Sequence, residues 1–96
     1  MAKFLMLGKY SLEAVKGLAS ERTKKVVGVV EKNAGKVISM YALAGVYDLV
    51  FILDFPDISH ALKTSVEITK LTGISLTTSP AVTVEEFDKI VSQPGE

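Results

Sequence analysis

Residues 45–48, Gly-Val-Tyr-Asp, hold the side chains best suited to chemistry in this chain of 96 residues. Asp48 follows the turn residue Gly45, and its carboxylate either accepts hydrogen bonds from turn amides or faces a cation. Arg22 is the candidate cation, because it falls on the apolar stripe of the first expected helix. Its guanidinium either reaches the helix edge while its stem packs, or points into a pocket and binds a carboxylate or phosphate.

Tyr41 and Tyr47 are further candidates, since each places a phenol on an apolar strand face. Buried phenols usually find a hydrogen-bond partner, so these rings either pack in a core or dimer contact or line a pocket. The candidate ligand-binding residues are therefore Arg22, Tyr41, Gly45, Tyr47 and Asp48. An Arg22–Asp48 pair, or a site flanked by both, requires the first helix to pack on the Asp48 face of the sheet.

Other reactive groups are sparse. His60 is the only histidine, and no acidic residues accompany it at the spacing of metal ligands. We therefore expect a solvated role for this ring and no metal site. The chain has no cysteine, hence no thiol nucleophile or thiolate ligand. Because no nucleophile–base pair or phosphate loop is present, the sequence assigns no catalytic residue and implies no cofactor.

The composition is apolar and electrically neutral. Hydrophobic residues make up 48% of the chain and the net charge is zero, so we expect no direct binding to nucleic acid. No apolar run is long enough to cross a bilayer, and the lack of cysteine makes the cytoplasm the economical location. A domain this small has much surface for its volume, so its excess apolar side chains predict a subunit interface.

Hydrophobic periodicity predicts four strands and three helices. The strands are expected over 3–9, 36–44, 47–55 and 74–79, and the helices over about 12–33, 57–72 and 84–91. A short turn at Gly45-Val46 makes the second and third strands a hairpin. The last four residues, 93–96, are expected to fray.

Caps and stripes refine these helices. Ser11 and Asp57 are expected N-caps, and Thr83 with Glu86 forms a capping box. Asn33 and Gly35 should stop the first helix, since both types tolerate the left-handed conformation. The expected buried stripes are Leu12, Val15, Leu18, Ala19, Arg22, Val26, Val29 and Val30, and then Ile58, Ala61, Leu62, Ser65, Val66 and Thr69. On the second strand, Val37, Ser39, Tyr41 and Leu43 should share a face.

The order of elements predicts a single domain over 1–96 with the ferredoxin-like βαββαβ fold and a short C-terminal helix. Two helices can cover only one face of its four-stranded antiparallel sheet. The first three strands are apolar on both faces, and exposing the second face costs many kcal/mol at about 25 cal/mol per Å². We therefore expect a homodimer through the open sheet face, a dimeric α+β barrel, with a higher oligomer also allowed.

The run Gly45-Val46-Tyr47-Asp48, followed by an apolar strand and by residues 54–57, resembles the GYD-domain family. Nearly the whole chain takes part in the resemblance, including residues 4–10, Arg22, residues 35–37 and Tyr41. The family usually has two glycines before the second strand, and here Ala34 replaces the first. The resemblance implies a ferredoxin-like fold and dimeric α+β-barrel assembly, and it implies little about activity.

A weaker similarity links residues 45–48 and 73–78 to the effector-sensing domain of feast/famine transcription regulators. This chain has no helix-turn-helix ahead of these segments, so any DNA-binding part would lie on another chain. Three functions stay open. One is a homo-oligomeric domain that binds a small molecule or serves assembly. The second is a cofactor-free monooxygenase or isomerase of the dimeric α+β-barrel type with Tyr or Asp as base. The third is effector sensing.

Overall fold

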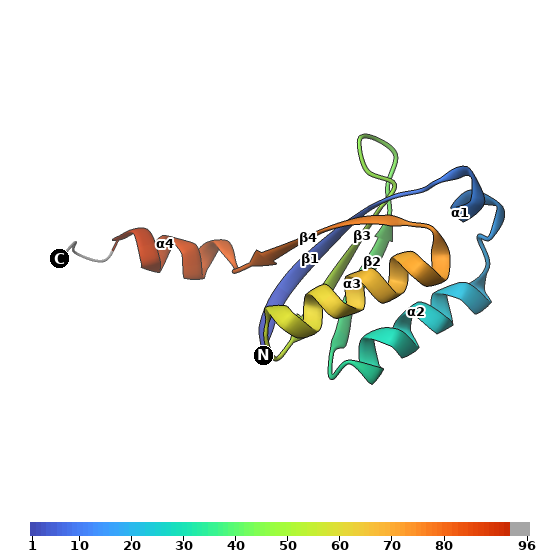
Figure 1. Ribbon diagram of the computed structural model, residues 1–96. Coiled ribbons are helices and arrows are strands. Elements are labelled where there is room, and N and C mark those ends of the chain that lie inside the picture. The colour runs from blue at the N-terminus through green and yellow to red at the C-terminus, as the bar shows by residue number, and fades with distance from the viewer. Residues whose placement is uncertain (93–96) are drawn as a thin grey trace.

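The computed structural model describes residues 1–92, which form one four-stranded sheet and four helices (Figure 1). The elements are β1 (Ala2–Lys9), α1 (Leu12–Lys16), α2 (Ser20–Lys32), β2 (Lys36–Ala42), β3 (Leu49–Phe55), α3 (Ile58–Thr72), β4 (Ser75–Ala81) and α4 (Val84–Ser92). The expected tail, residues 93–96, lies outside this range. Within it, no helix has the length and apolar character needed to cross a membrane.

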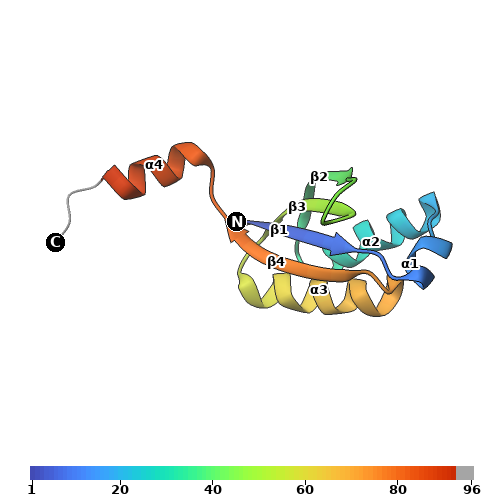
Figure 2. The same cartoon turned by 90° about the horizontal axis from the view of Figure 1, so that it is seen from above.

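The strands form one antiparallel sheet in the order β2-β3-β1-β4. α2 and α3 cover one face of this sheet, and no helix of residues 1–92 covers the other (Figure 2). This α+β arrangement is compatible with the ferredoxin-like fold that the element order predicts. The hairpin of β2 and β3 is confirmed.

Side chains alternate along β1 and β3 as expected. The face beneath the helices carries Phe4, Met6, Leu49, Phe51, Leu53 and Phe55, all buried. The opposite face, called the open face below, carries Lys3, Leu5, Leu7, Val50, Ile52 and Asp54. Two apolar rows therefore run across the uncovered side of the two central strands.

β2 departs from simple alternation because a bulge lies between Val37 and Ser39. The bulged residue, Ile38, shifts the register, so Met40 joins Val37 against the core although three positions separate them. Tyr41 stays on the open face. The expectation that Val37 and Tyr41 share a face is therefore wrong.

Two strand ends also differ from the prediction. β3 begins at Leu49, so residues 43–48 form a longer loop than a two-residue turn, closed by a 2.7 Å bond from the Leu43 amide to the Asp48 carbonyl. β4 continues through Pro80, where the sequence predicted a stop. β4 is an edge strand, and edge strands tolerate proline.

The first helical segment is broken, where the sequence predicted one helix. Ser11 caps α1 as expected, but the helix ends at Gly17, and α2 begins after Ala19, whose φ of −168° is extended. The change of direction exposes the first part of the expected stripe, Leu12, Val15 and Leu18. Its second part is buried on the sheet, at Val26 and Val30.

α2 ends in a Schellman motif. The Gly35 amide donates to the Val30 carbonyl (2.9 Å), and the Ala34 amide donates to the Glu31 carbonyl (3.1 Å). The left-handed residue is Ala34, with φ 64°. Neither Asn33 nor Gly35 takes this conformation, so the predicted stop lies in the right place but on a different residue.

α3 begins at its predicted cap, and the Asp57 carboxylate accepts the His60 amide at 3.0 Å. Its buried row is Ala61, Thr64, Ile68 and Thr72, whereas Leu62 and Val66 are about half exposed. The two threonine hydroxyls each donate to the carbonyl four residues earlier at 2.8 Å. Because these bonds satisfy the hydroxyls, Thr64 and Thr72 can be buried in the core. The apolar pattern instead predicts Leu62 and Val66 as buried residues.

α4 starts after Thr83, whose hydroxyl accepts the Glu86 amide at 3.1 Å, as one half of the predicted capping box requires. In place of the other half, the Glu86 carboxylate accepts the Thr83 hydroxyl at 3.3 Å. The helix projects beyond the end of the sheet, away from α2 and α3 (Figure 1). None of its residues is buried. Its apolar side chains are between 54% and 77% exposed, at Val84, Phe87, Ile90 and Val91.

Candidate functional site

Arg22 connects the two parts of the broken helix. Its Nη1 donates to the carbonyl of Ala14 near the end of α1. A Cβ at Gly17 would lie 2.9 Å from the same Nη1, so glycine leaves room for the guanidinium at the break. Arg22 is therefore held, half buried, at the corner between α1 and α2.

An inner cavity of about 70 Å³ lies under this corner. Most of its wall is apolar, from Leu18, Val26, Met40, Leu49, Phe51 and Ile74. Arg22 is the one charged residue of the lining. The volume equals that of about two water molecules, at roughly 30 Å³ each, so the cavity suits one small apolar group.

Arg22 also lines an outer cleft of about 480 Å³ beside α1 and the end of α3. Lys70 adds a second positive charge to this cleft and Glu13 a negative one. A guanidinium carries five N–H donors, and the bond to Ala14 uses one of them. Arg22 therefore has donors left for an anion at the boundary between an apolar cavity and an open cleft.

Asp48 is paired with the backbone of β1 and its following loop. Its Oδ2 accepts the Tyr10 amide at 2.8 Å, and its own amide donates to the Gly8 carbonyl at 2.8 Å. Asp48 makes no ion pair with Arg22 within residues 1–92. The carboxylate stabilises backbone amides, as one interpretation predicted, but the amide lies 38 residues away rather than in the hairpin turn.

The remaining predicted residues lie elsewhere. Tyr41 is 59% exposed on the open face, and Gly45 is exposed in the hairpin loop. The Lys9 ammonium lies 5.8 Å from the centre of the Tyr47 ring. Tyr41, Gly45 and Tyr47 are all absent from the linings of the inner cavity and the outer cleft. The five residues predicted as one site thus divide between the α1–α2 corner, the open face and the hairpin loop.

This division bears on catalysis. A general base must reach the substrate, and here the Asp48 carboxylate is bonded to the Tyr10 amide instead. Tyr10 is the one phenol in the lining of the inner cavity, and no carboxylate or histidine accompanies it there. The arrangement can hold a small molecule, and within residues 1–92 the cavity lining contains no carboxylate or histidine.

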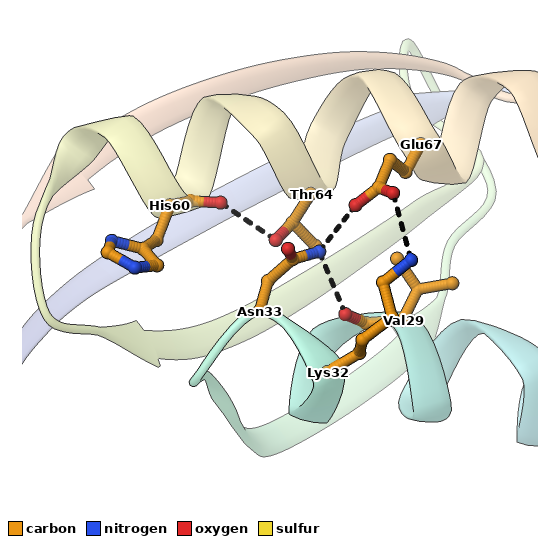
Figure 3. A network of polar contacts seen from close by, with 6 residues as sticks. All are labelled: Val29, Lys32, Asn33, His60, Thr64 and Glu67. Atoms are coloured by element: carbon orange, nitrogen blue, oxygen red, sulfur yellow. Dashed lines mark hydrogen bonds and ion pairs between the residues drawn. The ribbon is translucent and has the colours of Figure 1, made fainter.

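A polar cluster joins α2 to α3 at the other end of the helices (Figure 3). Glu67 accepts hydrogen bonds from the Asn33 side chain (2.6 Å) and from Lys32 (3.1 Å). The Asn33 bond, and then the Lys32 bond, hold the pKa of the Glu67 carboxyl below its ordinary value. An open cleft of about 310 Å³ borders the cluster. Because Glu67 of α3 bonds Lys32 and Asn33 at the end of α2, the cluster holds the two helices together.

Sequence reasoning missed both the cavity lining and this cluster. The sequence pattern marks Asn33 only as a helix stop, and its partner Glu67 lies 34 residues away. Tyr10 was assigned no role, although its amide bonds Asp48 and its side chain lines the cavity. No local pattern marks these residues, because each depends on a partner from another element.

The antiparallel sheet, with α2 and α3 on one face and a loop at residues 43–48, defines a small α+β domain compatible with the ferredoxin-like fold. The model of the GYD domain matches residues 4–91, and the chain therefore belongs to the GYD domain family. This confirms the resemblance carried by residues 45–48. No curated protein matches the chain in sequence.

Proposed function

We propose that this GYD domain is a homodimeric binding domain for a small molecule with an anionic group and a compact apolar group. Arg22 carries the proposal, because this one residue lines both the inner apolar cavity and the outer cleft. The anionic group would bind Arg22 in the outer cleft, where the planar fork of N–H donors suits a carboxylate or phosphate. The apolar group would enter the inner cavity.

The open face supports the homodimer. Leu5, Leu7, Val50 and Ile52 form adjacent rows on β1 and β3, and α2 and α3 cover the other face. Pairing these rows with the same rows of a second copy removes apolar area from water at about 25 cal/mol per Å². The contact is self-complementary, as a two-fold dimer requires. Tyr41 lies on the same face and would join it.

Thermal denaturation with three matched probes tests the binding proposal. Propionate and ethyl phosphate should raise the melting midpoint of the wild-type protein, because a ligand that binds only the folded state stabilises it. 1-Propanol, which has a similar apolar group but lacks the charge, should shift it far less. Arg22→Gln should remove the anion-dependent shift, and Lys24→Gln, an exposed lysine on the same helix, should keep it.

Equal shifts in Arg22→Gln and wild type, or no shift with either anion, would contradict the proposal. Since Arg22 also bonds Ala14, Arg22→Gln can lower stability by itself. Arg22→Lys provides a second measurement. It keeps the charge but lacks the fork, so it should bind both anions more weakly than wild type while remaining folded.

A further inference from the structure

α4 is an amphipathic helix without a surface to bind. It has nine residues, and helices shorter than about 12–15 residues are marginal in water on their own. Four apolar residues cluster on one side of it, at the helical spacing of Val84, Phe87, Ile90 and Val91. All four remain exposed. The helix therefore needs a docking surface that its own subunit does not supply in this structure.

The shape of the molecule leads to the same conclusion. The chain measures 52 × 30 × 18 Å, and its radius of gyration is 14.8 Å. A compact domain of this length has a radius of about 12.5 Å. Figure 2 shows α4 beyond the end of β4, on the side of the sheet away from α3. The helix thus leaves its own helical layer and extends toward the side on which the open face lies.

We infer that α4 is an exchanged arm, which docks on the open face of a second copy of this chain. This inference rests on the homodimer proposed above. The open face is the large apolar surface that α2 and α3 leave bare, with Leu5 and Leu7 of β1 in its centre. Each copy offers one unpartnered helix and one unpartnered sheet face, so a two-fold exchange satisfies both.

The side of the open face along β4 suits a helix. β4 presents short side chains there, Ser75, Thr77 and Ser79, beside the leucines of β1. Short side chains let the backbone of α4 approach closely, so that Phe87 and Ile90 can reach Leu5 and Leu7. The partner's sheet then covers the β3 side, and α4 covers the β4 side.

Charge and area favour the same partner. The polar side of α4 carries Glu85, Glu86 and Asp88 against a single Lys89. The β1 row of the open face ends in Lys3, which already pairs with Asp54 at 3.5 Å, and in Lys9, which pairs with no carboxylate within residues 1–92. The flat area of the open face is roughly 440 Å², from seven-residue strands and the usual strand spacing. A stable complex buries about 800 Å² per partner. The docked α4 helices of the two copies would supply part of the remaining buried area.

A single tryptophan reports on the docking, because the chain contains none. The Phe87→Trp variant should dimerise in sedimentation, and its emission should shift to shorter wavelength as concentration rises through the dimerisation range. The Val46→Trp variant, placed on a loop residue that is 76% exposed, should show no such shift. Adding Ile52→Glu on the open face should remove both the dimer and the shift. Ile90→Trp repeats the measurement if Phe87→Trp fails to fold.

A nitroxide label locates the docking site. In mixed dimers, a label on Ser79→Cys, on the open face, should quench the Phe87→Trp emission of the partner. A label on Ser59→Cys, on α3, should not. The chain has no cysteine of its own, so labelling is specific.

The failures are distinguishable. A dimer whose Phe87→Trp emission stays red-shifted overturns the arm and leaves the proposed dimer intact. A short-wavelength emission that is independent of concentration, or that survives Ile52→Glu, means that α4 packs on its own subunit and also overturns the arm. Quenching from Ser59→Cys alone overturns the open face as the docking surface. A monomer at all concentrations overturns the dimer and the arm together.

Discussion

Arg22 and Asp48 are best understood through the backbone groups that they bind. Arg22 donates to the Ala14 carbonyl at the end of α1, and Asp48 accepts the Tyr10 amide after β1. Both bonds fix segments that border the inner cavity. An arginine has donors to spare after such a bond, whereas the Oδ2 atom of Asp48 is occupied by the Tyr10 amide. Arg22 therefore remains a ligand-binding candidate, and Asp48 supports the cavity wall.

Ala34 is the residue whose backbone is least suited to its type. Its φ of 64° is left-handed, which costs an L-residue roughly 1–2 kcal/mol. Glycine adopts this conformation freely but loses about 0.5–1 kcal/mol more entropy on folding. Ala34→Gly should therefore raise the free energy of unfolding by about 0.5–1 kcal/mol, as measured by urea denaturation.

The matched control for this substitution is Ala44→Gly, in the exposed hairpin loop, where φ is not positive. That variant should be neutral or slightly destabilised, because it adds chain entropy without relieving strain. Equal effects at both positions would show that the Ala34 backbone is not strained.

At the scale of elements, helix ends determine where the segments begin and change direction. The glycine at 17 ends α1, and the extended backbone at Ala19 starts α2 in a new direction. The Schellman motif at residues 30–35 then turns the chain into β2. Asp57 caps the N-terminus of α3. Its carboxyl group titrates, so the stability that this cap contributes depends on pH.

The Asp57 cap predicts a pH dependence. The side-chain bond with His60 (2.7 Å to Nδ1), and then the bond from the His60 amide, lower the pKa of this carboxyl below its ordinary 3.8. Because the folded-state pKa is the lower one, the cap stabilises the fold above the ordinary value. That stability is lost as the pH falls through the lowered value.

Urea midpoints measured from about pH 6 down to about pH 2 should therefore fall less steeply for Asp57→Asn than for wild type, since asparagine caps without titrating. Asp88→Asn, an exposed carboxylate on α4, serves as the control and should keep the wild-type slope. Identical slopes for all three proteins would rule out a contribution from the Asp57 cap.

At the scale of the whole molecule, the open face is the feature on which the proposed dimer depends. Its centre, at Val50 and Ile52, lies opposite Leu7 and Leu5 on β1. A sheet of this kind, with helices on one face only, either stays partly wet or finds a second copy. The proposed dimer makes the apolar content of the chain understandable without a larger core.

Ile52→Glu tests this arrangement. Burying an unpaired carboxylate in an interface costs about 2–5 kcal/mol, which is roughly 30- to several-thousand-fold in the dissociation constant. Sedimentation should show wild-type protein at twice 10.3 kDa at micromolar concentration and the variant at 10.3 kDa, with unchanged circular dichroism. Val46→Glu in the hairpin loop should remain dimeric. Wild-type protein that sediments at 10.3 kDa would refute the dimer.

The amino-acid sequence by itself determined the order of the strands, the alternation of β1 and β3, and the caps at Ser11, Asp57 and Thr83. These features depend on neighbours within about four residues, or on a period that the chain repeats. The same local signals were sufficient to indicate the family, through residues 45–48, and the matched model confirms it.

Only the tertiary structure decided the break after α1, the bulge at Ile38, the buried threonines of α3 and the division of the predicted site. Each depends on how separate elements pack: Arg22 bonds the Ala14 carbonyl of α1, and Asp48 accepts the Tyr10 amide 38 residues earlier. The packing of the elements determines which of several similar apolar patterns is buried and which polar groups bond to each other. Spacing along the chain does not contain that information.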